Sequence, residues 1–230
     1  MTSTLQSLQT AQKSKTPLLA ILIDPDKFDP FSAPEFVRNL PITTSHLFIG
    51  GSTVEPGATK RVVSALKTCT ALPLVLFPGD YSQIDGQADA LLFLSLLSGN
   101  NPEYLIGQQI KAVPRLQHNQ LEVIPTGYIL IDGGNDSAVS RVTNTTPIDQ
   151  NEQDLICDTA MAAQYMGKRC IYLEAGSGAI HPVRPEIIEQ VVSKVDIPVI
   201  VGGGIRADHQ LQAAYQAGAT MVVMGTVFEQ

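Results

Sequence analysis

The sequence predicts an α/β protein, a modified (β/α)8 TIM barrel that takes up residues 1–230 as one domain. Three observations predict this fold. Short apolar runs recur at nearly even intervals, helical patterns lie between several of them, and the 230 residues come close to the roughly 250 of one such barrel. No repeat, linker or low-complexity tract divides the chain.

The apolar runs are expected to be the barrel strands. Most are aliphatic or β-branched throughout rather than alternating, which is typical of parallel strands covered on both faces. The expected strands are residues 18–23, 46–49, 74–77, 90–96, 121–124, 170–173, 198–201 and 221–224. The expected helices are residues 58–67, 102–115, 154–166, 185–194 and 207–217.

Three places depart from a regular barrel. Residues 78–89 are too short and too rich in turn residues for a full helix, so the helix after the third strand is expected to be missing or shortened. Residues 124–168 are too long for one loop and helix, which is typical of a lid or binding loop. The chain ends at Gln230, just after the eighth strand, so we expect no C-terminal covering helix in this chain.

The composition and charge of the chain exclude some classes of function and indicate where the protein works. A formal net charge of -7 argues against nucleic acid as the main partner. The polar first 15 residues do not resemble a signal peptide, and no run approaches the roughly 20 apolar residues of a membrane span, so no stable membrane insertion is expected. Three cysteines without regular spacing suggest reduced thiols and a cytoplasmic protein.

Glycine-rich turns follow the last two expected strands. Gly202, Gly203 and Gly204 end the seventh, and Gly225 and Thr226 end the eighth. In barrels these two loops commonly bind a phosphate, because glycine lets backbone N–H groups approach the anion. The alternative is that the glycines serve only tight turns. The neighbouring Arg206 could add a charge there or could be a solvated helix residue.

The sixth strand ends in the run Tyr172-Leu173-Glu174-Ala175-Gly176-Ser177-Gly178. Side chains alternate along a strand, so Tyr172 and Glu174 share one face and Leu173 points toward the helices. A carboxylate at the catalytic end of a strand is a candidate general base. The alternative is a structural Glu174 that is hydrogen-bonded to a loop.

The first two strands end in Asp24-Pro25-Asp26-Lys27 and Gly50-Gly51-Ser52-Thr53. A carboxylate and a hydroxyl on neighbouring strands could hold one Mg2+ that keeps most of its ligands as water and phosphate oxygens. The alternative for Asp-Pro-Asp is a turn and helix cap. Because the eighth strand of a barrel adjoins the first, all these sites form one arc, which suits two phosphorylated substrates side by side.

Over about residues 18–228 the chain resembles the geranylgeranylglyceryl phosphate synthases, prenyltransferases that make the first ether bond of archaeal-type lipids. The glycine loops are shared with many phosphate-binding barrels, whereas the other motifs are more specific. The resemblance rests on Ile23-Asp24-Pro25-Asp26-Lys27, Gly50-Gly51-Ser52-Thr53, Pro125-Thr126-Gly127-Tyr128, the run from Tyr172 to Gly178, Gly202-Gly203-Gly204 and Gly225-Thr226.

The resemblance implies a reaction in which the 3-hydroxyl of sn-glycerol 1-phosphate attacks C1 of a prenyl diphosphate and releases pyrophosphate. It implies that Asp24 and Ser52 hold Mg2+ and that Glu174 is the base, with Tyr172 beside it in the catalytic site. It also implies the glycerol phosphate site, formed by Tyr172, Leu173, Glu174, Ala175, Gly176, Ser177, Gly178, Gly203, Gly204, Gly225 and Thr226.

Other expectations follow from single positions. Related bacterial enzymes that use longer prenyl chains carry a lysine where this chain has Leu22, which favours geranylgeranyl diphosphate. Phe77, Tyr81 and Leu92 are candidate walls of a prenyl groove left by the missing helix. We expect a homo-oligomer, a dimer or larger.

Two other kinds of protein stay open at this point. One is a sugar-phosphate isomerase or aldolase on the same fold, although no lysine lies within an apolar strand to form a Schiff base. The other is a non-catalytic barrel that binds a phosphometabolite, which would have no use for Glu174 or Asp24.

Overall fold

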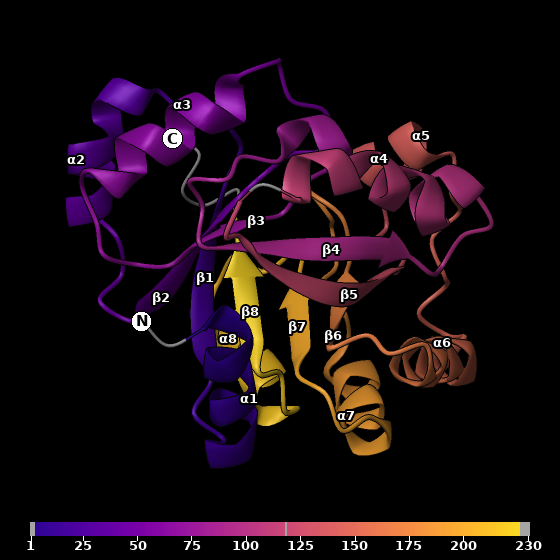
Figure 1. Ribbon diagram of the computed structural model, residues 1–230. Helices are drawn as coiled ribbons and strands as arrows, with labels where there is room; N and C mark the ends of the chain where they lie inside the picture. Colours follow the sequence, from indigo (N-terminus) through magenta and orange to yellow (C-terminus); the bar gives the residue numbers. More distant parts are fainter. Residues whose placement is uncertain (1–2, 118, 226–230) are drawn as a thin grey trace.

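The computed structural model describes residues 3–117 and 119–225, and in this part of the chain parallel strands close into a barrel in the order β1 to β8 (Figure 1). Each strand pairs with its neighbours along the chain, and β8 pairs with β1. The strands are β1 (Leu18–Ile23), β2 (Thr44–Ile49), β3 (Leu74–Leu76), β4 (Ala90–Leu96), β5 (Glu122–Leu130), β6 (Cys170–Glu174), β7 (Val199–Gly202) and β8 (Met221–Met224).

Helices surround the barrel and also cover its lower end. They are α1 (Thr4–Ser14), α2 (Ala33–Arg38), α3 (Ala58–Lys67), α4 (Gln108–Leu116), α5 (Ala138–Thr143), α6 (Gln153–Tyr165), α7 (Pro185–Lys194) and α8 (Asp208–Gln216). Short helical segments are η1 (Pro30–Ser32) and η2 (Tyr81–Gln83), while the π-helical η3 (Glu103–Gly107) leads into α4. None of the described helices is both long and apolar enough to cross a membrane.

The fold predicted from the sequence is the one observed. As expected, the helix after the third strand is shortened: only η2, one short turn, lies between β3 and β4. The predicted end of the fifth strand was wrong: β5 runs through Pro125 to Leu130 and does not stop at residue 124. The expectation that no covering helix follows β8 concerns residues 226–230, which lie outside the described residues.

Side chains divide into an inner and an outer apolar core. Phe48, Leu92 and Ile200 point into the barrel, whereas Leu47, Leu91 and Val201 pack against the helices. The alternation follows from the period of a strand, in which successive side chains point to opposite faces. It aims alternate residues at each strand's end into the mouth of the barrel.

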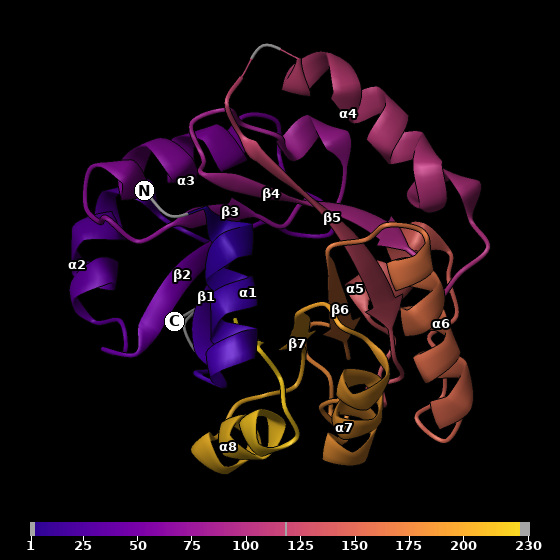
Figure 2. The ribbon, with the colours of Figure 1, turned by 60° about the horizontal axis from the view of Figure 1, so that its bottom comes forward.

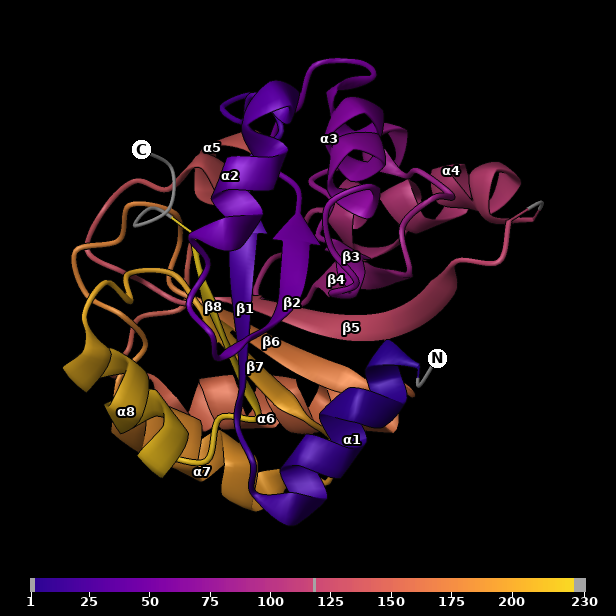
Figure 3. The ribbon, with the colours of Figure 1, turned by 90° about the vertical axis from the view of Figure 1, so that its left-hand side faces the viewer.

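Helix α1 closes the barrel at the end opposite to that mouth. In Figure 2 it lies inside the ring of outer helices, and Leu8 is fully buried with the inner core. Its first turn is held by Glu122 at the start of β5, whose carboxylate accepts hydrogen bonds from the Thr4 and Leu5 N–H groups at 2.7 and 3.1 Å. A carboxylate at a helix N-terminus satisfies free N–H groups and complements the helix dipole. Figure 3 shows α1 and α5 at opposite ends of the barrel, so α1 does not cover the end at which α5 lies.

Candidate active site

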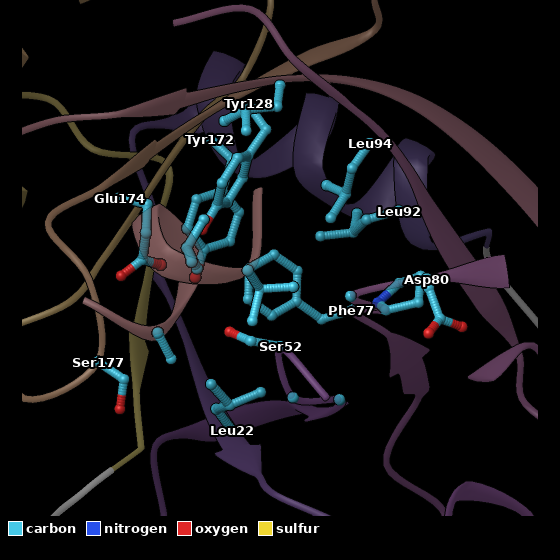
Figure 4. Close-up of a pocket in the computed structure, with 18 of the residues that line it drawn as sticks. Leu22, Ser52, Phe77, Asp80, Leu92, Leu94, Tyr128, Tyr172, Glu174 and Ser177 are labelled. Carbon is cyan, nitrogen blue, oxygen red and sulfur yellow. The ribbon is translucent and has the colours of Figure 1, made fainter. Parts of the chain in front are cut away.

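A cavity of about 390 Å3 opens at the carboxyl ends of the strands. It is lined by residues that follow six of the strands, by residues within β4 and β5, and by side chains of α4 and α5. Figure 4 shows Glu174 and Ser177 on one side and Leu92 and Leu94 on the other, with Phe77 and Tyr172 between them. One wall is therefore polar and the other apolar, and an aromatic pair separates them.

The polar wall is made by the loops after β6, β7 and β8. Ser177, Gly178, Gly203, Gly204 and Gly225 line the cavity, as expected for a phosphate site. Gly203 and Gly204 have φ angles of 82° and 73°, a region that side chains rarely adopt. Successive glycines in this conformation leave backbone N–H groups free to face an anion.

Glu174 and Tyr172 meet on the inner side of this wall. A Cβ atom at Gly202 would collide with the Tyr172 hydroxyl and approach Glu174 Oε2 to 3.0 Å, so both groups converge over this glycine. Glu174 Oε1 accepts a hydrogen bond from the Gly176 N–H at 2.7 Å. The Tyr172 hydroxyl is buried and has no hydrogen-bond partner of good geometry in the described part of the chain. A buried hydroxyl without a partner beside a carboxylate is suited to bind a ligand hydroxyl.

The electrostatics of Glu174 differ from those of an ordinary carboxyl group. Burial raises the pKa of Glu174 to about 7, and the hydrogen bond from Gly176 and the nearby Tyr172 hydroxyl only partly offset that rise. Glu174 is 6% exposed, so desolvation is the dominant cause. A group that titrates near neutral pH can accept and release a proton during turnover.

The structure places the rest of the strand-six run differently. The side chains of Leu173 and Ala175 lie in the outer core, and neither these residues nor Gly176 line the cavity. The Ala175 N–H donates to Gly202 O at 3.0 Å and the Gly176 N–H is bonded to Glu174. Within this run the cavity is therefore lined only by Tyr172, Glu174, Ser177 and Gly178. Thr226, also expected at the site, lies outside the described residues.

Asp24 and Ser52 both line the cavity, at the ends of β1 and β2. Asp24 Oδ2 lies 3.2 Å from Lys27 Nζ, while Oδ1 accepts a hydrogen bond from the Asp26 N–H at 3.1 Å. A Cβ atom on Gly51 would come within 3.2 Å of Asp24 Oδ1, which brings the carboxylate against the backbone next to Ser52. Asp24 thus has the turn contacts of the alternative interpretation and also faces the cavity.

This donor set fits Mg2+ better than other metals. Within the described residues no cluster of three or more His, Cys, Asp or Glu side chains could enclose an ion. Zinc sites need such a cluster, whereas Mg2+ commonly takes one or two carboxylates and fills its octahedron with water and substrate phosphate oxygens. Asp24 with Ser52 would suffice for that arrangement.

The apolar wall lies where the helix after β3 is reduced. All three candidate groove residues, Phe77, Tyr81 and Leu92, line the cavity, and the Phe77 ring stacks on Tyr172 with centroids 4.7 Å apart. The lining also includes Ala112 of α4 and Val139 of α5. Sequence reasoning missed the two helical walls, because the pattern of α4 resembles that of any outer helix and α5 is only one and a half turns long.

No described strand contains a lysine, so the Schiff base of an aldolase has no candidate at a strand end. The buried carboxyl of Glu174 is also hard to explain in a barrel that only binds phosphate. Burying an ionisable group without an ion-pair partner is unfavourable, and function is the usual reason for it.

Comparisons with known proteins agree on one family. The family model described as "PcrB family" matches residues 12–230. A protein from Zunongwangia profunda named geranylgeranylglyceryl phosphate synthase is 52% identical over 229 residues, covering 100% of this chain and 98% of its own. One of the same name from Thermococcus kodakarensis is 39% identical over 212 residues, covering 91% of this chain and 83% of its own.

Solved structures give the same result. The crystal structure of (S)-3-O-geranylgeranylglyceryl phosphate synthase from Thermoplasma acidophilum, in complex with substrate sn-glycerol-1-phosphate, superposes with a TM-score of 0.91 at 34% identity. The match covers 100% of this chain and 93% of that one. The YdjI aldolase of Escherichia coli K12 shares only the fold, with a TM-score of 0.55 at 12% identity.

Proposed function

This chain belongs to the PcrB family, and on that premise we propose that it transfers the geranylgeranyl group of geranylgeranyl diphosphate to the 3-hydroxyl of sn-glycerol 1-phosphate. The product is an ether, and pyrophosphate is released. The observation that carries the proposal is Glu174, a buried carboxyl with a pKa of about 7, between a glycine-lined phosphate site and an apolar groove.

The polar wall is the proposed site for glycerol phosphate. The loops with Ser177, Gly178, Gly203, Gly204 and Gly225 would bind the phosphate through backbone N–H groups. The glycerol hydroxyls would then lie toward Tyr172 and Glu174, where the unpartnered Tyr172 hydroxyl gives one of them a hydrogen-bond partner. Fixing the phosphate in this way brings the nucleophilic oxygen close to the electrophile, which by itself supplies much of the rate enhancement.

Glu174 is the proposed general base. As the C–O bond forms, its carboxylate takes the proton of the attacking 3-hydroxyl while the C1–O bond to diphosphate breaks. Burial disfavours its charge, so the proton is accepted more readily than by an exposed carboxylate. Tyr172 would orient the hydroxyl and the carboxylate with respect to each other.

We propose Mg2+ as the cofactor, held by Asp24 and Ser52. When bound there, the ion would neutralise the charge of the diphosphate leaving group. The diphosphate would then lie at the ends of β1 and β2, next to the phosphate site of β7 and β8 because β8 adjoins β1. Its C1 carbon would face Glu174 across the mouth of the barrel.

The prenyl chain would occupy the apolar groove. From the ends of β1 and β2 it can extend away from the glycerol phosphate only toward β3 and β4, past Phe77, Tyr81 and Leu92. Leu22 also lines the cavity. By the family resemblance, enzymes for longer prenyl chains carry a lysine at this position. This supports the geranylgeranyl group as the natural substrate.

We also propose a cytoplasmic homo-oligomer, a dimer or larger. None of the three cysteines forms a disulfide, which supports a reducing compartment. Ile106, Ile110 and Val113 expose one apolar stripe along η3 and α4, as expected of a subunit contact. Light scattering of the wild-type protein and of Ile110→Glu tests the assembly, because a charge in this stripe would shift the mass toward that of a monomer.

The reaction itself is tested with labelled sn-glycerol 1-phosphate, geranylgeranyl diphosphate and Mg2+, followed by extraction into butanol. Label should enter the organic phase only when all three are present, and excess chelator should abolish the transfer. The enantiomeric sn-glycerol 3-phosphate is the matched control and should be a poor substrate. If no prenyl diphosphate yields a butanol-soluble product, the proposal is wrong and a phosphate-binding role remains.

A further inference from the structure

Two buried glutamines lie behind the mouth of the barrel, one in each half. Gln83 ends η2, the short turn that replaces the helix after β3, and is 4% exposed. Its side-chain Nε2 donates to Gly51 O at 2.9 Å, and its Oε1 accepts from the Gly79 N–H at 3.1 Å. One amide group therefore joins the loop after β2 to the loop after β3.

The contact between these two loops is close. A Cβ atom on Gly79 would collide with the carbonyl oxygens of Gly51 and Ser52, so the backbones of the two loops touch. The pairing of β2 with β3 ends at Ile49 and Leu76, and the last hydrogen bond of this ladder runs from the Phe77 N–H to Ile49 O at 2.9 Å, before the point of contact. Gln83 makes one hydrogen bond to each of the two loops, and Ser52 directly follows Gly51, whose carbonyl oxygen Gln83 binds.

Gln150 has the same geometry in the other half. It is 6% exposed, its Nε2 donates to Asp132 O at 2.8 Å and Pro182 O at 3.3 Å, and its Oε1 accepts from the Arg184 N–H at 2.9 Å. Asp132 follows β5, while Pro182 and Arg184 belong to the loop after β6. A second amide group thus joins a second pair of neighbouring loops.

The segment held by Gln150 touches the phosphate site. A Cβ atom on Gly204 would approach the Pro182 N atom to 2.9 Å, so the position of Pro182 limits where Gly204 can lie. The same segment continues from Ser177 and Gly178, which line the polar wall. Gln150 itself does not line the cavity, and neither does Gln83.

We infer that Gln83 and Gln150 are positioning residues, each of which sets the shape of one substrate site independently of the other. Gln83 holds the loop that carries Ser52 and acts on the use of prenyl diphosphate. Gln150 holds the loop that carries Ser177 and Gly178 and acts on the use of glycerol phosphate. The assignment of each glutamine to a substrate rests on the proposed function.

The chemistry of the side chain explains why glutamine occupies both positions. Joining two loops by their backbones needs a donor for a carbonyl and an acceptor for an N–H group, and an uncharged primary amide has both. A carboxylate lacks the donor, and a lysine lacks the acceptor and would bring a charge into a buried position.

The test is a pair of matched variants, Gln83→Met and Gln150→Met, which keep the volume and remove the amide. For Gln83→Met we expect the KM for geranylgeranyl diphosphate to rise about 10- to 100-fold, with the KM for sn-glycerol 1-phosphate within about twofold of wild type. For Gln150→Met we expect the reverse. Each variant is the control for the other, and Val191→Ala in the outer core controls for loss of stability alone, since it should change neither KM.

Hydrogen exchange provides a readout that needs no turnover. The Gly79 N–H should lose protection in Gln83→Met, and the Arg184 N–H should lose it in Gln150→Met, each without change at the other site. Gln83→Glu and Gln150→Glu keep the acceptor and lose the donor. They should retain protection at these two N–H groups and have KM values between wild type and the Met variants, which provides the test if a Met variant does not fold.

The outcomes separate the two proposals. The wild-type enzyme could form product while each Met variant raises both KM values equally or leaves both unchanged. In that case the inference is wrong and the proposed function stands. If the wild type forms no product, the proposed function fails and the assignment of the glutamines to substrates fails with it. Unchanged exchange at Gly79 and Arg184 in folded Met variants would also overturn the inference.

Discussion

The two halves of the barrel mouth treat a carboxylate in opposite ways. At the end of β6, Glu174 is buried against backbone and aromatic groups, and its pKa rises to about 7. After β1, Asp24 stays partly exposed beside Lys27 and lines the cavity. The first environment makes a base that can exchange its proton near neutral pH, and the second leaves a carboxylate facing the cavity, where it could bind a cation.

The difference arises from what packs around each strand end. Glycine-rich backbone of β7 and its loop closes over Glu174 and excludes water from it. Between β3 and β4 the helix is reduced to η2. The cavity wall there is made of separate side chains and leaves room for an apolar chain. The same barrel therefore provides a tight polar site and an open apolar one, and changes in each half should have different effects.

The largest effect is expected for Glu174→Gln. The variant should bind sn-glycerol 1-phosphate but lose about 10²- to 10⁴-fold in kcat, the usual contribution of a general base. In the wild type, kcat/KM should rise with pH and level off above about 7, because the carboxyl must be deprotonated to accept the proton. Steady-state rates and calorimetric binding measure both. A kcat within a few-fold of wild type, or an unchanged pH profile in the variant, would contradict the role of Glu174.

Asp24→Asn tests the other half. We expect kcat/KM for geranylgeranyl diphosphate to fall roughly 100-fold, because the proposed Mg2+ loses its only carboxylate, while the KM for glycerol phosphate changes little. Asp26→Asn is the control, since Asp26 lies in the same loop as Asp24, accepts a hydrogen bond from the Glu55 N–H of the next loop and does not line the cavity. If raising the Mg2+ concentration has no effect on Asp24→Asn, or if both variants behave alike, the assignment of the metal site is wrong.

The pH dependence of stability sharpens the comparison through a second buried group. His46 on β2 is 2% exposed, and burial lowers its pKa from 6.5 to about 4. Its contribution to stability is present above pH 6.5 and is lost as the pH falls toward 4. Glu174, raised from 4.5 to about 7, has the opposite sign: its contribution is present below pH 4.5 and is lost as the pH rises through 7.

Between pH 4.5 and 6.5 the two slopes oppose each other, so these groups should leave wild-type stability nearly constant. In Glu174→Gln the free energy of unfolding should increase with pH by about 1.4 kcal/mol per unit, and in His46→Asn it should decrease at a similar rate. Urea unfolding at a series of pH values measures both. Parallel curves for the two variants would refute the opposite pKa shifts of these two groups.

The smallest effect concerns the apolar groove. Ala138→Trp on α5 should fill part of the cavity and shift the preference from geranylgeranyl toward farnesyl diphosphate by about tenfold, since two buried methylene groups account for that ratio. Competition between the two diphosphates measures the shift, with Ala138→Ser as a variant that adds little volume. An unchanged preference would show that the end of the prenyl chain lies elsewhere.

Much of the fold followed from periodicity. The aliphatic runs of β1, β4 and β8 have the bounds expected from the sequence, and so do α3 and α7. The shortage of residues between β3 and β4 correctly predicted a reduced helix, because a packed helix and its loops need more chain. The end of β5 was missed because proline usually ends a strand, whereas Pro125 here continues one.

The candidate site was predictable where a residue's role depends on its own strand. Glu174, Tyr172, Asp24 and Ser52 line one cavity because each lies at or just after a strand end. Roles that depend on contacts between distant loops were not predictable. Gln83 and Gln150 have no motif, and the exclusion of Leu173 and Ala175 from the cavity depends on the hydrogen bonds and packing of that loop.

The hydrogen bonds between Glu122 and the first turn of α1 link residues about half the chain apart, and they bear on the order of folding. The helix that closes the lower end of the barrel is synthesised first, but its partner on β5 leaves the ribosome only after all of the first four strands. Contacts of such long sequence separation form late and slowly. Until then Leu8 and the apolar face of α1 have no barrel to enter, so the nascent chain exposes them to solvent or to a chaperone.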